Sequence, residues 1–363
     1  MSDQTIRRTL TLLLPLLLLL FSWSCASSSV PSSPPASSPT STPESSSTPP
    51  GPPLTTDSSK PPTSQPAQNP PQIPQPDAPP APRPEAVSLT GVQLSAPPLS
   101  ADVQKKRDDE LAAAQSEYDK NPSSADAMIW LGRRLAYLGR FQDAIAVFSR
   151  GIETFPDDAR FYRHRGHRHI TLRNFGRAIA DLAEGRRLMK GKKDQIEPDG
   201  LPNARNIPTT SLQSNLCYHL GVAYYLRGDF EGALKTLRPC MKVSRSPDRL
   251  VSTSNWLYMT LRRLGRQDEA TAILEPITMD MDVIENSSYH KLLLMYAGEI
   301  APEELLREKG GGNDPATIGY GVGNWYMYNG QAKKAEETFR AVLKGSRWDA
   351  FGYIASEAEL ARK

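Results

Sequence analysis

The sequence predicts an all-α fold, an α-solenoid of about six helix-turn-helix repeats that follows a disordered segment rich in Pro and Ser. The main observation is a segment, residues 125–192, that copies itself at an offset of 34 residues. The matched pairs are Gly132 and Gly166, Leu138 and Leu172, Phe141 and Phe175, Ala144 and Ala178, Ile145 and Ile179, and Gly151 and Gly185. A fixed period of this size indicates stacked helical units, because each unit must bury its apolar face against the next.

Small and aromatic residues stand at the same places in both copies. They are Leu131, Gly132, Ala144, Phe148 and Pro156 in the first copy and Gly166, Ala178 and Leu182 in the second, where Arg165 and Lys190 depart from the pattern. This pattern resembles the tetratricopeptide repeat. The resemblance implies paired antiparallel helices that expose a binding surface, and it leaves the partner unnamed.

The array should occupy residues 100–363. We expect repeats at 125–158, 159–192, 214–247, 251–282, 286–306 and 316–348, of which the fifth is degenerate. A charged helix that begins near Ser100 should cover the first repeat, and a helix over 349–362 should cap the last, since terminal repeats need polar covers. An insertion over 191–213 interrupts the period, and we expect it to be a passive loop on one face of the array.

The first 26 residues are typical of an export signal. Arg7 and Arg8 precede an apolar run that is too short to span a bilayer as a helix. Cys25 directly follows the apolar run and the residues Ser22, Trp23 and Ser24, and this stretch resembles the cleavage site of a bacterial lipoprotein. We therefore expect lipid on Cys25 and an outer-membrane location facing the periplasm. The alternative is ordinary cleavage after Ala26, which would give a soluble periplasmic or secreted protein.

A low-complexity segment follows, from residue 27 to 99. It holds 22 of the 33 prolines of the chain, with much Ser, Thr and Ala. Such a composition buries too little apolar surface to offset the entropy of ordering, so the sequence predicts a disordered spacer.

The overall composition argues against several functional classes. The formal net charge of +3 over 363 residues gives no electrostatic footprint for a nucleic-acid binder. Neither a catalytic constellation nor a phosphate-binding glycine loop is evident, so we expect no enzyme and no cofactor. His164 and His167 share one helix face, but no acidic or Cys ligand is fixed beside them, so we expect no metal site.

A basic helix in the second repeat carries the candidate binding residues. Arg160, Arg163 and His167 lie three and four residues apart and should project into the concave groove together with Arg133 of the first repeat. Such a groove suits an acidic peptide, a terminal carboxylate or a phosphate. The alternative is a solvated basic face that nearby acids neutralise, namely Asp157, Asp158 and Asp181.

Cys217 and Cys240 fall on the two helices of the third repeat, where antiparallel pairing brings them close. They form either a disulfide, in an oxidising compartment, or a pair of small buried residues.

The sequence thus indicates a non-enzymatic adaptor that binds a protein or peptide in its groove at the bacterial cell envelope, anchored to the membrane through Cys25. The alternative is an architectural subunit of a stable envelope complex that uses its convex face and caps.

Overall fold

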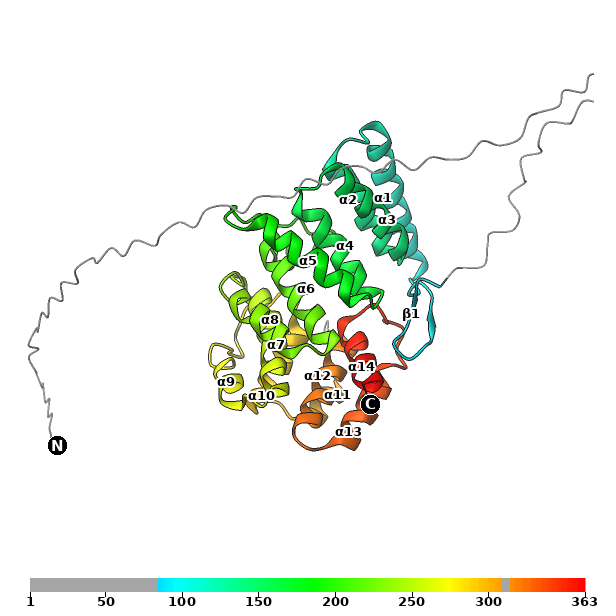
Figure 1. Cartoon of the computed structure of the whole chain (residues 1–363). Helices are drawn as coiled ribbons and strands as arrows, with labels where there is room; N and C mark the ends of the chain where they lie inside the picture. The colour runs from blue at the N-terminus through cyan, green and yellow to red at the C-terminus, as the bar shows by residue number, and fades with distance from the viewer. Residues whose placement is uncertain (1–83, 309–313, 363) are drawn as a thin grey trace, which may run out of the picture. The chain divides into compact units, whose positions relative to one another are not determined.

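The computed structural model describes residues 84–308 and 314–362, which form fourteen helices and one two-stranded hairpin (Figure 1). The predicted leader, Cys25 and most of the predicted spacer lie outside these residues. The elements are β1 (Ala86–Val87), β2 (Gln93–Leu94), α1 (Ala101–Lys120), α2 (Ala125–Tyr137), α3 (Phe141–Thr154), α4 (Ala159–Thr171), α5 (Phe175–Met189), α6 (Leu212–Arg227), α7 (Phe230–Cys240), α8 (Pro247–Arg263), α9 (Gln267–Ala272), α10 (Ser287–Ala297), α11 (Pro302–Arg307), α12 (Pro315–Tyr328), α13 (Ala332–Val342) and α14 (Phe351–Ala361).

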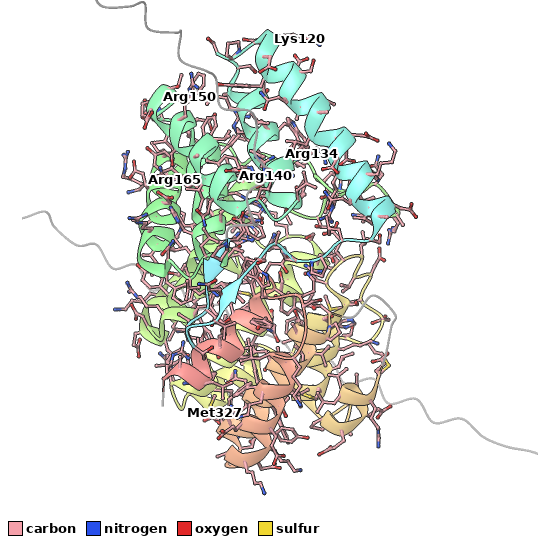
Figure 2. All side chains as sticks on the ribbon, turned by 90° about the vertical axis from the view of Figure 1, so that its right-hand side faces the viewer. Lys120, Arg134, Arg140, Arg150, Arg165 and Met327 are labelled. Carbon is pink, nitrogen blue, oxygen red and sulfur yellow. A yellow bond between two sulfur atoms is a disulfide. The ribbon has the colours of Figure 1, made fainter. Side chains whose placement is uncertain are left out.

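The helices α2 to α13 pair as six hairpins, and the predicted all-α repeat fold is confirmed. The degenerate fifth repeat is present as α10 and the short α11. The third and fourth repeats begin a few residues earlier than expected, because Ser211 and Ser246 cap α6 and α8. α1 covers the first repeat as predicted: Arg134 of α2, labelled in Figure 2, donates to Glu110 of α1 at 2.8 Å.

Close approach between the two helices of a repeat depends on a missing side chain. A Cβ atom built on Gly132 would lie 2.4 Å from Cε1 of Phe148, which is closer than real contacts allow. Phe148 is 1% exposed and fills the space between α2 and α3. The glycines of the repeat signature are therefore a packing requirement of the paired helices.

The C-terminal end of the predicted spacer is structured, which corrects the expected boundary at residue 99. Ala86 pairs with Leu94 in the antiparallel hairpin, and Gly91 makes its turn with φ of 87°. The side chain of Gln142 in α3 donates to the carbonyl oxygens of Pro84 (3.2 Å) and Glu85 (2.8 Å). Residues 84–99 thus pack against the first repeat as part of the described array.

The last helix does more than cap the last repeat. Arg173, in the turn between α4 and α5 of the second repeat, donates from Nε and Nη2 to the two carboxylate oxygens of Glu357 in α14, both at 2.9 Å. The two side chains are 3% and 1% exposed. Arg173 also donates to the carbonyl oxygen of Trp348 at 3.0 Å, and Arg362 donates to that of Tyr225 in α6 at 3.1 Å. α14 therefore joins the last repeat to the second and third (Figure 1).

The turn that supplies this arginine is itself unusual. Five of the six turns inside the repeats place a glycine at positive φ, as Gly139 does in the first repeat. The second repeat places Arg173 there with φ of 63°. A non-glycine residue in this conformation costs on the order of 1 kcal/mol, so the buried ion pair must offset that cost.

We predict that Arg173→Gly destabilises the protein although glycine suits the turn. The substitution leaves Glu357 buried without its cation, which costs about 3–5 kcal/mol in unfolding free energy. Urea unfolding would measure the loss. Adding Glu357→Gln should restore part of it, because a neutral amide is cheaper to bury than an unpaired carboxylate. An Arg173→Gly variant as stable as the wild type would contradict this account.

Candidate functional site

The candidate site is a cavity of about 340 Å³ on the inner face, which we define as the face made by α2, α4, α6, α8 and α10. Its lining includes Arg133 and Tyr137 of α2, Arg163 of α4, Asn215, Tyr218 and His219 of α6, Arg249 and Ser252 of α8, Tyr289 of α10 and Phe351 of α14. The insertion between α5 and α6 completes the wall. It spans residues 190–211, and we call it the strap.

Three arginines converge on this cavity from three repeats. Arg163 donates from Nη2 to Oε1 of Glu197 in the strap at 2.8 Å. Arg133 and Arg249 are 8% and 7% exposed, and neither has an ion pair within the described part of the chain. Glu197, Asp199 and Glu285 also line the cavity, so the case for an anion there rests on Arg133 and Arg249. Burying a charge without a paired countercharge is costly, and an added anion beside these two arginines would offset that cost.

Neutral groups hold these arginines in place. Arg133 donates to the carbonyl oxygen of Pro198 at 2.8 Å, and its guanidinium lies 4.4 Å from the ring centre of Trp130. Arg249 donates to Oδ1 of Asn215 at 2.6 Å and lies 4.7 Å from the ring centre of Tyr218. The positive charges are thus oriented mostly by amides, carbonyls and aromatic faces.

Buried nitrogen atoms without a hydrogen-bond partner stand at the same place. At the cavity they are Nε of Arg163 and Nε of Arg249, each without a partner among the described residues. Nδ1 of His167, behind the cavity wall, also has none among these residues. Buried polar atoms in folded proteins nearly always have a partner, so unpaired donors that cluster at one cavity point to a ligand there.

The surroundings lower the pKa of the basic groups at the cavity. Burial lowers the pKa of Arg163 and of Arg249, while the charge of Glu197 opposes the shift in both. Burial also holds the pKa of His219 well below its ordinary value, and Arg163 and Arg249 lower it further. Nδ1 of His219 lies 2.7 Å from the carbonyl oxygen of Asn215 and therefore carries the proton of the neutral ring.

A second hollow is larger but different in character. About 710 Å³ in volume, it lies beside α5, α6 and α7, with an apolar floor that includes Leu216 and Leu220. Its basic residues, such as Lys190 and Lys192, stand on an exposed rim. Of the two hollows, the inner-face cavity is the one lined by buried arginines.

Residues 125–168 match the tetratricopeptide repeat family. The chain contains a tetratricopeptide repeat. The predicted tetratricopeptide repeat is thereby confirmed over these residues, and the helices α2 to α13 continue the same paired arrangement through the described array. Among residues 84–308 and 314–362, no helix has the length and apolar character that a membrane span needs.

Comparison with curated proteins found no match. Among solved structures, a tetratricopeptide repeat protein from Parabacteroides merdae is 13% identical over 72% of this chain and 98% of its own, with a TM-score of 0.43. YrrB, described as having an unusual peptide-binding site, is 16% identical over 68% of this chain and 98% of its own, with a TM-score of 0.37. PilW, a type IV pilus biogenesis factor, is 13% identical over 66% and 86%, with a TM-score of 0.40. These similarities are too low to identify a partner.

Of the four residues that the sequence placed in the groove, two line the cavity and two do not. Arg133 and Arg163 line the cavity. Arg160 does not, because its guanidinium pairs with Asp158 at 2.6 Å and with Asp126 of the preceding repeat at 2.5 Å. His167 lies behind the cavity wall, with its ring centre 4.3 Å from that of His219.

The alternative of a neutralised basic face holds for part of α4. Asp158 neutralises Arg160, and Asp181 forms a two-point ion pair with Arg165 at 2.7 and 2.8 Å. It does not hold for Arg163, whose countercharge comes from the strap. The basic helix is therefore divided between ion pairs within the repeats and the inner-face cavity.

Several residues of the site were not predicted. Asn215 and His219 lie four residues apart on α6, a spacing that could have placed both on the inner face. Arg249, in the first turn of α8, belongs to no pattern that marks it. The strap was expected to be a passive loop, yet its Glu197 is the countercharge of Arg163. The signal available in the sequence was an acidic residue in the insertion that follows the basic second repeat, which could have indicated an ion pair between the two.

Cys217 and Cys240 form a disulfide in the structure, with their Cα atoms 5.7 Å apart. It joins α6 to the last residue of α7 across a sequence separation of 23 residues. A crosslink of that length stabilises by roughly 3 kcal/mol in the loop-entropy account. The bond would thus fix the helix that carries Asn215 and His219.

We predict that the stability of the protein falls as the pH drops below about 6.5. His164, His167 and His219 all have a pKa well below the ordinary 6.5, chiefly through burial. A lowered pKa in the folded state means that the unfolded chain binds protons first, so each histidine removes about 1.4 kcal/mol per pH unit below that value. Urea unfolding from pH 7 to about 5 would measure the slope. His167→Gln should reduce it by about one proton, and an unchanged slope would contradict this assignment.

Proposed function

We propose that this chain is a non-enzymatic adaptor whose inner-face cavity binds an acidic segment of a protein partner at the bacterial cell envelope. One observation carries the proposal: Arg133, Arg163 and Arg249 surround the cavity, and only Arg163 has an ion pair within the described residues. Buried arginines form strong charge-assisted hydrogen bonds with carboxylates, which makes an acidic group the natural occupant.

A protein partner suits the fold better than a free small ion. Tetratricopeptide repeats present one helix of each pair on the inner face, and the fold is used mainly as a scaffold for protein interactions. The cavity draws residues from five helices of that face. A segment that crosses several repeats can therefore make contacts that an isolated ion cannot.

The envelope location rests on the sequence. The leader, Cys25 and the proline-rich spacer are those expected of a tethered exported protein. Extended at ~3.1 Å per residue, the part of the spacer up to residue 83 could reach on the order of 180 Å. A tether of that length would hold the array well away from the membrane that anchors it.

The architectural alternative also has an observation in its favour. α14 and the strap cover part of the inner face, which leaves the second helices of the repeats as the more open surface. An architectural complex made through that surface would not depend on buried arginines. Substitutions in the cavity therefore separate the two functions.

We predict that a photocrosslinking residue at Tyr289, which lines the cavity, captures an acidic segment of one envelope protein in the native host. Arg249→Gln should reduce this crosslink at least tenfold, because each charge-assisted hydrogen bond contributes about 1.5–3 kcal/mol. The exposed Arg245→Gln is the matched control and should leave it unchanged. A partner retained equally by the wild type and by Arg249→Gln would favour the architectural function instead.

We also predict lipid on Cys25. The mass of the mature N-terminal peptide and the membrane fraction of the full chain would measure it. Cys25→Ala should move the protein to the soluble fraction, since the remaining leader lacks a spanning segment. A mature N-terminus without lipid that begins at Ser27 would overturn the anchor.

A further inference from the structure

The strap crosses the inner face and is tied down on both sides of it. On one side, Arg133 donates to the carbonyl oxygen of Pro198 at 2.8 Å and Arg134 to that of Gly200 at 3.0 Å. Figure 2 labels Arg134 on α2, close to α1. The first repeat therefore holds the strap through two consecutive arginines that bind main-chain oxygens, as they would bind any extended peptide.

The other side of the strap is tied to the loop before α10. Asn203 donates to Oε1 of Glu285 at 2.6 Å, and Thr209 donates to Oε2 of the same carboxylate at 2.9 Å. Arg205 pairs with Asp282 at 2.6 Å. The strap thus spans the face from the first repeat to the fifth.

Glu197 is the centre of this arrangement. Its Oε1 accepts from Arg163 at 2.8 Å and its Oε2 accepts from Asn215 at 2.9 Å. The side chain is 9% exposed. The inner face therefore already binds a stretch of peptide. It binds the buried carboxylate of Glu197 and, after it, the main-chain carbonyl oxygens that accept from Arg133 and Arg134.

The strap is held almost entirely by polar contacts. Its three large apolar side chains, Ile196, Leu201 and Ile207, are 73%, 45% and 43% exposed. A segment that buries little apolar surface opens at a small free-energy cost compared with a core helix. Displacing the strap would therefore leave the hydrophobic core of the repeats intact.

The strap is also an imperfect ligand for this face. Nε of Arg163 and Nε of Arg249 have no partner in the described residues, although both side chains are buried or nearly so. Burial raises the pKa of Glu285, and the like charge of Asp199 in the strap adds to the rise. A peptide with a second acidic group near Arg249, and without an acid beside Glu285, would bind better.

We infer that residues 197–200 are an internal ligand, which an extended acidic peptide of the partner replaces on Arg163, Asn215, Arg133 and Arg134. This inference rests on the proposed function and adds its regulation. A tethered competitor acts at an effective concentration on the order of millimolar, so the strap excludes weak acidic peptides. A partner segment with two acidic groups overcomes that competition by adding a bond to Arg249.

The probe for this inference is the strap itself, as a fluorescent peptide with the sequence Gln-Ile-Glu-Pro-Asp-Gly of residues 195–200. Anisotropy titration measures its binding to the full mature chain. Glu197→Gln, which weakens the internal ligand, should bind the peptide at least tenfold more tightly than the wild type does. Glu184→Gln in α5, at a half-buried carboxylate that pairs with Arg187 away from the inner face, is the matched control and should behave as the wild type.

Two additional measurements test the position of the peptide. Arg163→Gln in the Glu197→Gln background should abolish binding, and a probe with Gln in place of its Glu should not bind. Saturating peptide should speed amide hydrogen exchange in residues 196–205 of the wild-type chain, which needs no variant to fold. Circular dichroism confirms that each variant retains its helices.

The outcomes separate this inference from the proposed function. Equal affinity of the wild type and Glu197→Gln, or unchanged hydrogen exchange in the strap, would overturn the internal ligand while leaving the adaptor function standing. A probe that binds neither the wild type nor any folded variant would also overturn the internal ligand. The proposed function fails on a different result, a crosslinked partner that is indifferent to Arg249→Gln.

Discussion

The arrangement of this array depends on the buried pair of Arg173 and Glu357, because it ties the last helix to the second repeat. Both side chains are almost inaccessible, and their bidentate geometry directs α14 to one position. The arginine occupies the left-handed turn position that glycine holds in the other repeats. A costly backbone conformation and a buried charge thus support each other: the turn aims the guanidinium inward, and the carboxylate compensates its charge.

This closure changes what the inner face can do. An open array of helical pairs would expose its arginines to water, where ion pairs contribute little. Here α14 brings Phe351 to the cavity, and the strap brings Glu197, so Arg133 and Arg249 are shielded from solvent. In a less polar environment, an added carboxylate interacts more strongly with these charges. Selectivity for acidic segments and exclusion of weak ligands would then follow from the same covering elements.

The repeats themselves were predictable from sequence because their packing constraints are local. Gly132 must lack a side chain where Phe148 crosses it, and its recurrence as Gly166 marks the next unit. The degenerate fifth repeat was also found, since α10 keeps the apolar spacing of a first helix. The hairpin at residues 84–99 was missed because its composition continues that of the spacer. Its order comes from partners far along the chain, Gln142 and Trp348.

The candidate site was likewise predictable from the sequence only where local constraints determine it. Helix periodicity alone determined that Arg133 and Arg163 face inward, because the face of a helix is fixed by its spacing. Periodicity could not show that Arg160, in the first turn of α4, reaches back to Asp158 and across to Asp126. Only the tertiary structure decided that the strap lies over the inner face and that Glu197 meets Arg163. Contacts between segments distant in sequence depend on chain direction after a loop, which no local pattern of residues encodes.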